Sequence, residues 1–207
     1  MRTRVLPAWR AVRGIQKAVR VRNASGRSLT QRITLAPHTV GVVGSGDTPH
    51  TELANEVGAV LAELGVNLLT GGGGGVMTSV SAAFTQAERR RGVCIGVIPC
   101  ASIEHRASPK PGYPNRFVEL AIYTHLPLSG EQGTDDLSRN HVNVLSSTAI
   151  VALPGQAGTA SEVSLAVRYG KPIVAYSRDA QLIRNFPRAV QRVTSIDGVK
   201  RFLQAHV

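Results

Sequence analysis

The stretch NLLTGGGGGVM, residues 67–77, joins a short apolar run to a segment with helical spacing through five consecutive glycines. Such a run is typical either of a flexible linker between domains or of a tight junction where the backbone approaches a ligand. The flanking residues decide between the two. Apolar strand-like runs occupy 39–46 and 93–100, and apolar residues recur with helical spacing over 50–64 and 76–90.

The resulting order of strand, helix, strand, helix, strand predicts βαβ units, which form a parallel sheet covered on both faces. The glycines then join a buried strand to its own crossover helix, so they are not an interdomain linker. Further strands are predicted at 117–126, 148–155 and 172–176, and further helices at 135–146 and 159–169. The predicted fold class is α/β, with a single doubly wound parallel sheet of Rossmann-like type.

Several helix ends also have expected residues. Gly65 is expected to end the helix 50–64. Asp135 and Asp136 either begin the helix 135–146 or neighbour the ligand, and the first alternative is favoured. The run Arg89–Arg91 would form a solvated cationic end of the helix 76–90. One or two amphipathic helices are expected after Asp179, the last capped by Asp197.

The first 36 residues differ from the rest of the chain in charge. They hold nine of the 24 Lys and Arg residues and no acidic residue, which leaves 15 basic and 13 acidic residues for 37–207. Most of the net charge of +11 therefore lies in an N-terminal arm, and we expect two parts, an arm at 1–36 and a nucleotide-binding domain at 37–207. Alternation over 19–23, a turn at 24–27 and a β-rich segment at 28–35 predict a β-hairpin extension within the arm.

Three roles are open for this arm: a solvated extension, a targeting segment, or a contact surface for RNA, DNA or an anionic surface. A cleaved presequence does not need a hairpin, which argues against targeting. The charge balance of the remaining domain argues against nucleic acid as its ligand.

Cysteine content and polarity bound the location of the protein. Cys94 and Cys100 flank an apolar strand and indicate a reduced, cytoplasmic protein. No compact Cys/His set predicts a metal site. Residues 66–84 lack charge, but their glycines and hydroxyl residues argue against a membrane span.

Three glycine-bearing loops follow predicted strands: GSGDTP (44–49), TGGGGGVM (70–77) and LPGQAGTASE (153–162). The carboxyl ends of parallel strands share one edge, so these loops can converge on one ligand, with helix N-terminal amides facing an anion. The first loop departs from the dinucleotide fingerprint, because Pro49 replaces its third glycine. The second lacks the Lys of a P-loop. Neither NAD binding nor ATP hydrolysis is therefore expected.

Two charged residues near the third loop have alternative interpretations. Thr159 and Glu162 fit a capping box that closes a helix start, or Glu162 stands at the crevice edge and stabilises a cation or orients water. Arg139, on the preceding predicted helix, is either solvated or clamps a phosphate.

The sequence resembles the superfamily of LOG ("lonely guy") proteins, long called lysine decarboxylases. The family motifs GGGxGxM and PGGxGTxxE appear here as GGGGGVM (71–77) and PGQAGTASE (154–162), with Arg139 between them, and the likeness covers roughly residues 39–176. The resemblance implies a Rossmann-like homodimer or homotetramer that cuts the N-glycosidic bond of nucleoside 5′-monophosphates, with no metal or cofactor required. Glu162 would be the catalytic carboxylate and Arg139 its partner.

Three departures point to a second interpretation. Asn140 follows Arg139 where the enzymes have Lys, Gln156 replaces the second glycine of PGG, and Thr148 replaces an Asp. The Arg-Asn pair is similar to a sister branch that includes molybdenum-cofactor carrier proteins, in which molybdopterin would be bound as cargo without reaction. Under either interpretation, the expected ligand-binding residues are Gly44, Ser45, Gly72, Gly73, Gly74, Gly75, Met77, Asn140, Gly155, Gln156, Ala157, Gly158 and Thr159.

Overall fold

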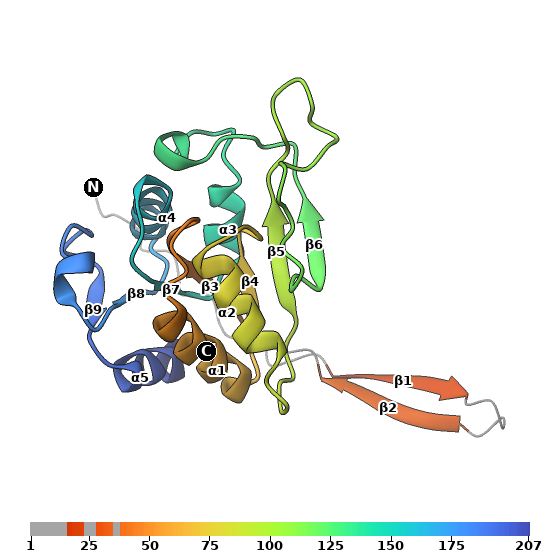
Figure 1. Cartoon of the computed structure of the whole chain (residues 1–207). Helices are drawn as coiled ribbons and strands as arrows, with labels where there is room; N and C mark the ends of the chain where they lie inside the picture. Colours follow the sequence, from red (N-terminus) through yellow and green to blue (C-terminus); the bar gives the residue numbers. More distant parts are fainter. Residues whose placement is uncertain (1–15, 23–27, 35–37) are drawn as a thin grey trace, which may run out of the picture. The chain divides into compact units, whose positions relative to one another are not determined.

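The protein is represented by a computed structural model (Figure 1), which describes residues 16–22, 28–34 and 38–207. Its contacts divide the chain into two units, 1–37 and 38–207. In the first unit, β1 (Gln16–Arg22) and β2 (Ser28–Thr34) pair antiparallel, as the alternating residues predicted. The predicted turn at 24–27 lies outside the described residues.

The second unit is built on a seven-stranded parallel sheet, which confirms the predicted fold class. Its strands follow the order β6-β5-β4-β3-β7-β8-β9, so the chain moves outward from β3 in one direction and then returns to add β7 on the other side. Strand order therefore reverses between β3 and β7, where open α/β sheets bind their ligands. The strands are β3 (Thr39–Val43), β4 (Asn67–Thr70), β5 (Cys94–Ile98), β6 (Leu120–Tyr123), β7 (Ala149–Ala152), β8 (Ile173–Tyr176) and β9 (Gln191–Val193).

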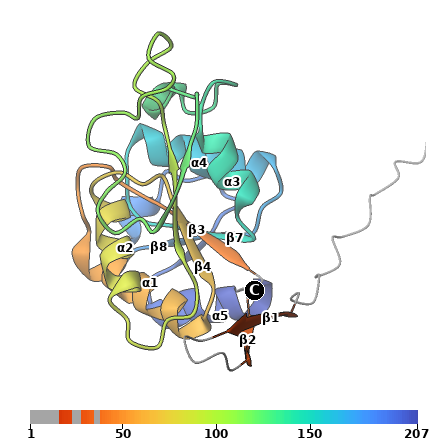
Figure 2. The ribbon, with the colours of Figure 1, turned by 90° about the vertical axis from the view of Figure 1, so that its right-hand side faces the viewer.

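Helices cover both faces of this sheet (Figure 2). The first face packs β-strand residues such as Val42 and Leu68 against α1, α2 and α5. The second packs Ile150 and Ala152 against α3 and α4. Side chains that alternate along the strands pack into two hydrophobic cores, one on each face of the sheet. The near-continuous apolar strands predicted this arrangement. The helices are α1 (Thr51–Leu64), α2 (Val76–Thr85), α3 (Asn140–Ser146), α4 (Ala157–Arg168) and α5 (Ile196–His206), with short 3-10 turns at Gly130–Gln132 and Ala180–Ile183.

Two helices differ from the prediction at their ends. α1 ends at Gly65 in the left-handed conformation (φ 70°), as predicted. α2 stops at Thr85, five residues early, and Arg90 is not a solvated helix end: its guanidinium donates to both carboxylate oxygens of Glu119 (2.7 Å each). Arg90 therefore pairs with Glu119, which is distant in the sequence, and does not interact with the end of α2 as predicted.

The third and last helices also start elsewhere. α3 begins at Asn140, so Asp135 and Asp136 lie in the preceding turn and cap nothing. α5 is capped by Ser195, whose hydroxyl accepts from the Gly198 amide (3.3 Å), and Asp197 lies inside its first turn. β9 was not predicted, because three residues, two of them exposed, carry too short a pattern.

Candidate functional site

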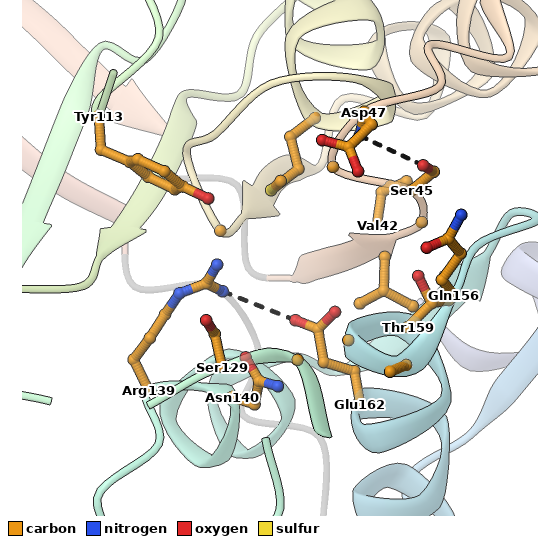
Figure 3. Close-up of a pocket in the computed structure, with 18 of the residues that line it drawn as sticks. Val42, Ser45, Asp47, Tyr113, Ser129, Arg139, Asn140, Gln156, Thr159 and Glu162 are labelled. Carbon is orange, nitrogen blue, oxygen red and sulfur yellow. Dashed lines mark hydrogen bonds and ion pairs between the residues drawn. The ribbon is translucent and has the colours of Figure 1, made fainter. Parts of the chain in front are cut away.

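A pocket of about 310 Å³ lies at the carboxyl edge of the sheet, where strand order reverses (Figure 3). Its lining comes from the loops after β3 and β7, from the start of the glycine run, from the long β5–β6 connection and from residues 129–140. Loops far apart in the sequence therefore meet at one cavity, as the parallel sheet predicted. Its volume is at the lower end of the range of small-ligand sites.

Arg139 extends into this pocket from the residue before α3 (Figure 3). It is buried, with 5% of its surface exposed, and its Nη1 lies 3.7 Å from Oε1 of Glu162. Within the described chain, its Nε and Nη1 have no hydrogen-bond acceptor. Buried donors are nearly always paired, and a guanidinium is charged at every physiological pH. The arrangement therefore suits an anionic ligand.

Gly71 makes the position of this guanidinium possible. A Cβ at Gly71 would lie 2.2–2.5 Å from three guanidinium atoms of Arg139, so the side chain rests directly on the glycine backbone. Gly71 also lines the pocket, although only the four glycines after it were predicted to bind the ligand. Five identical residues carry no signal that separates the first from the others.

Glu162 stands beside Arg139 on α4 and is also buried. Its Oε1 accepts a hydrogen bond from Nδ2 of Asn143 (2.9 Å). Burial raises the pKa of Glu162 above its ordinary value, although the charge of Arg139 and the bond from Asn143 act in the opposite direction. Such a carboxylate binds protons more strongly than an exposed one and is suited to acid–base chemistry.

The capping-box interpretation of Glu162 is wrong. α4 begins at Ala157, with Gln156 as its extended N-cap, so Thr159 is the third helical residue and Glu162 lies in the second turn. Gln156 has an extended backbone (φ −103°, ψ −150°), and the helix begins at the next residue. Glu162 is thereby placed on the pocket side of the helix (Figure 3).

The N-terminus of α4 supplies backbone donors to the pocket. The first helical bond runs from the Ala160 amide to the Gln156 carbonyl (3.0 Å). The amides of Ala157, Gly158 and Thr159 precede it and make no hydrogen bond within the described chain, as is usual for a first turn. All three residues line the cavity, so these donors add to the positive potential of Arg139.

Gly155 is not part of the pocket lining. A Cβ at this position would lie 2.0 Å from the Thr159 hydroxyl and 2.8 Å from the Ser45 amide. The glycine is therefore required for packing between the β3 and β7 loops.

The remaining glycines of the run, Gly72–Gly75, are likewise absent from the lining. A Cβ at Gly75, which has φ 56°, would lie 2.3 Å from the Ser45 carbonyl, and that carbonyl accepts from the Val76 amide (2.9 Å). The Gly73 amide donates to the sulfur of Met77 (3.4 Å). The run thus fastens α2 to the β3 loop.

The structure brings the other expected residues together. Around Arg139 and Glu162 the cavity is lined by Gly44, Ser45, Met77, Asn140, Gln156, Ala157, Gly158 and Thr159. Ser45 shapes its loop by accepting from the amides of Asp47 (3.2 Å) and Thr48 (2.9 Å).

Nine of the lining residues were not predicted, and four of these have polar side chains: Asp47, Lys110, Tyr113 and Ser129. Asp47 belongs to GSGDTP (44–49), in which the glycines and Pro49, and not the acid, carry the recognisable pattern. Lys110 and Tyr113 belong to the irregular segment 99–119, which has no periodicity to predict where it folds.

Metal-ligand clusters and membrane-spanning helices are both absent from the described residues. Over 16–22, 28–34 and 38–207, no three His, Cys, Asp or Glu side chains gather as metal ligands would. Over the same ranges, no helix is both long and apolar enough to cross a bilayer.

Comparison with known proteins identifies a family and several relatives of this chain. The SLOG cluster4 family model matches residues 37–203. An uncharacterized protein of Archaeoglobus fulgidus is 30% identical over 138 residues, which are 66% of this chain and 78% of that protein.

Two solved structures resemble the chain over most of its length. The molybdenum cofactor binding protein of the phototrophic bacterium Rippkaea orientalis has a TM-score of 0.61 and 29% identity, over 81% of this chain and 96% of that one. The molybdenum cofactor carrier protein of Chlamydomonas reinhardtii has a TM-score of 0.60 and 30% identity, over 82% and 97%. The expected resemblance to the LOG-like superfamily, near its molybdenum-cofactor carrier branch, is confirmed.

Proposed function

Because the chain belongs to the SLOG cluster4 family, we propose that it binds a phosphorylated nucleotide-type ligand in the pocket at the carboxyl edge of its sheet. One observation carries this proposal: the buried guanidinium of Arg139 has two nitrogens without acceptors in the described chain, in a cavity that the first-turn residues of α4 also line. A phosphate group offers several oxygens to such donors.

The first candidate ligand is a phosphorylated pterin, with the molybdenum cofactor as cargo. Two proteins that are about 30% identical over four fifths of this chain are described as binding or carrying that cofactor. The pocket donors fit the phosphate of such a ligand. No reaction is required of a carrier, which agrees with Asn140 and Gln156 standing where the enzymes of the superfamily have other residues.

The second candidate is hydrolysis of a nucleoside 5′-monophosphate, favoured by the position of Glu162 in the pocket beside Arg139. Glu162 would take a proton from water, whose oxygen bonds to C1′ as the C1′–N bond breaks. The base leaves with the bonding pair and takes up the proton that Glu162 removed from water, which returns Glu162 to its ionised state. A raised pKa strengthens Glu162 as a base near neutral pH, and Arg139 would hold the 5′-phosphate.

Binding is tested by calorimetric titration with ribose 5-phosphate and a panel of 5′-monophosphates. We expect Arg139→Ala to weaken each by roughly 10–100-fold, the range for a hydrogen bond to a charged group. Arg178→Ala is the matched control, because Arg178 is exposed and pairs with Glu52 and Glu56 away from the pocket. Equal affinities for Arg139→Ala and the wild type would refute the site.

Cargo and catalysis are separated by two further measurements. Purified protein is denatured and the released material is assayed for pterin fluorescence, with Arg139→Ala as the depleted control. In parallel, each monophosphate is incubated with the protein and free base is quantified, with Glu162→Gln expected to stop release. Pterin without base release identifies a carrier, base release identifies a hydrolase, and absence of both together with absent binding overturns the proposal.

A further inference from the structure

One wall of the pocket is built from the loop after β3, the first turn of α2 and the β5–β6 connection, and it includes the exposed carboxylate of Asp47. A Cβ at Gly46 would lie 3.9 Å from the methyl of Met77, and the sulfur of Met77 accepts from the Gly73 amide (3.4 Å). A Cβ at Gly73 would lie 2.5 Å from the hydroxyl oxygen of Tyr113 and 2.6 Å from its Cζ. Gly46, Met77, Gly73 and Tyr113 are therefore neighbours in sequence of contact, and Asp47, which follows Gly46 in the chain, lines the same cavity as Met77 and Tyr113.

The segment that bears Tyr113 is fastened to the glycine run. The Asn115 amide donates to the Gly72 carbonyl (2.7 Å), and its side-chain Nδ2 donates to the Gly73 carbonyl (2.9 Å). With no side chain at Gly73, the phenol ring rests against the backbone. Tyr113 is thus a positioned lining residue and not a freely rotating one.

The Asp47 carboxylate is available to a ligand. Its own backbone amide is held by the Ser45 hydroxyl, yet within the described residues its carboxylate makes no hydrogen bond or ion pair. Figure 3 shows Asp47 and Tyr113 entering the pocket from the side opposite Arg139 and Glu162.

The lining holds charges of both signs. Arg139 and the α4 amides attract phosphate, and Asp47 repels it; the second lysine or arginine of the lining, Lys110, is exposed and lies on the same segment as Tyr113. The ring of the ligand is then left to the wall of Asp47, Met77 and Tyr113, where a thioether and an aromatic ring offer apolar surface. An ionised carboxylate is acceptor-only and takes two parallel N–H donors well.

Resting on the proposed function, we infer that Asp47 selects ligands with a 2-amino-4-oxo ring edge. This edge presents a ring N–H and an exocyclic NH₂ side by side, and it is shared by guanine and by pterins. Hypoxanthine lacks the NH₂ group, and adenine lacks the ring N–H, so neither can satisfy both carboxylate oxygens. Asp47 is a specificity residue and takes no part in any bond cleavage.

The test is a titration of the full chain with GMP, IMP, AMP, neopterin monophosphate and ribose 5-phosphate. We expect GMP to bind about 10-fold or more tighter than IMP or AMP, the discrimination of one good bidentate pair. In Asp47→Asn, GMP and neopterin monophosphate should fall to the affinity of IMP. Ribose 5-phosphate should bind the variant as well as the wild type or slightly better, because a repulsive charge is gone.

Asp197→Asn is the matched control, since it removes an exposed acid on α5, outside the pocket. The tighter of GMP and neopterin monophosphate identifies the source of the ring. Wild-type binding that is equal for GMP, IMP and AMP and dependent on Arg139 overturns this inference and leaves the proposed function standing. A loss of ribose 5-phosphate binding in Asp47→Asn also overturns it, and no binding of any probe refutes the proposed function itself.

Discussion

Arg139 and Glu162 lie beside each other in the pocket but do not form a hydrogen-bonded ion pair. Donors of Arg139 are therefore available to a ligand. At 3.7 Å, their nearest charged atoms are too far apart for a hydrogen bond. Glu162 uses the same oxygen to accept from Asn143, and Arg139 keeps two donors without acceptors. Both groups have lost most of their hydration, so a phosphate on the free donors of Arg139, or a water between the two side chains, would restore contacts that folding removed.

Glu162→Gln should change stability in a pH-dependent way. The pKa of Glu162 is raised above the ordinary 4.5, chiefly by burial, so the folded state binds this proton more strongly than the unfolded state. The wild type therefore loses stability relative to the variant as pH rises from about 4.5 through the folded pKa. Thermal unfolding of both proteins between pH 4.5 and 8 checks this. A variant that becomes less stable relative to the wild type as pH rises would contradict this prediction.

At the scale of elements, glycines at the strand ends divide into two kinds. Gly71, Gly75 and Gly155 are required by packing, since an added Cβ would lie within 2.3 Å of a neighbouring atom. Gly158 differs: within the first turn of α4, its Cβ would meet only Gly130 atoms at 3.8 Å. Nothing in the described fold demands a glycine at position 158, which agrees with close approach of a ligand to its amide.

Substituting two of these glycines should separate stability from binding. Gly158→Ala is expected to keep the free energy of unfolding or to raise it by up to about 1 kcal/mol, because alanine favours a helix. The same variant should bind phosphorylated ligands more weakly. Gly155→Ala should be destabilising through its clash with Thr159 and Ser45. Urea unfolding and calorimetric titration of both variants check the pair. Full ligand affinity in Gly158→Ala would remove the argument for its amide.

A carboxylate next to the edge strand β6 adds side-chain bonds to its backbone pairing with β5. The Glu119 carboxylate accepts from Arg90 and from the Cys94 amide (2.9 Å). Partial burial acts to raise the pKa of Glu119, but the bonds from Arg90 and Cys94 outweigh it and leave that pKa below its ordinary value. The contact is partly exposed, so we expect its contribution to be modest, about 0.5–1 kcal/mol.

Glu119→Gln should therefore destabilise the protein at neutral pH by that amount. A lowered folded pKa means that the stabilisation is complete above the ordinary pKa of 4.5 and is lost as pH falls through the folded value. The wild type and the variant should accordingly converge in acid. Urea unfolding at pH 7 and at pH 3.5 checks this, and a difference that persists unchanged at pH 3.5 would contradict it.

At the scale of the whole molecule, charge and ligand site lie in different parts of the chain. The arm at 1–36 carries nine basic residues and no acidic ones, whereas every residue that lines the pocket lies between 42 and 162. The homodimer or homotetramer expected from the family resemblance stays a prediction, which native mass spectrometry of the full chain tests.

Deleting residues 1–36 should leave the affinity for GMP and for ribose 5-phosphate within about 2-fold of the full chain, allowing for weaker long-range attraction of anions. Any binding to RNA or DNA should disappear with the arm, and in the full chain it should weaken steeply with added salt. Calorimetry and filter binding check the two halves of this prediction. Nucleic-acid binding that survives the deletion would assign it to the domain instead.

Apart from β9, the order of strands and helices, the parallel sheet and the shared edge for three loops could be predicted from the sequence, because apolar periodicity reports which residues are buried. Glu162 and Arg139 were also found, through motifs of ordered spacing. The starts of α3, α4 and α5 were predicted at the wrong residues. Several nearby residues could cap each helix, and tertiary contacts determine at which one the helix begins. Local sequence also could not show that Gly71 supports Arg139 while Gly72–Gly75 support the loops.

Two features of the site were decided by tertiary structure alone. Asp47 and Tyr113 are 66 residues apart in the sequence, and only the folding of the 99–119 segment onto the glycine run places both in one cavity. The unpaired state of Arg139 likewise depends on which acceptors surround it after folding. Local patterns determine which segments are buried, whereas the electrostatics of a pocket depend on distances between segments that no local pattern contains.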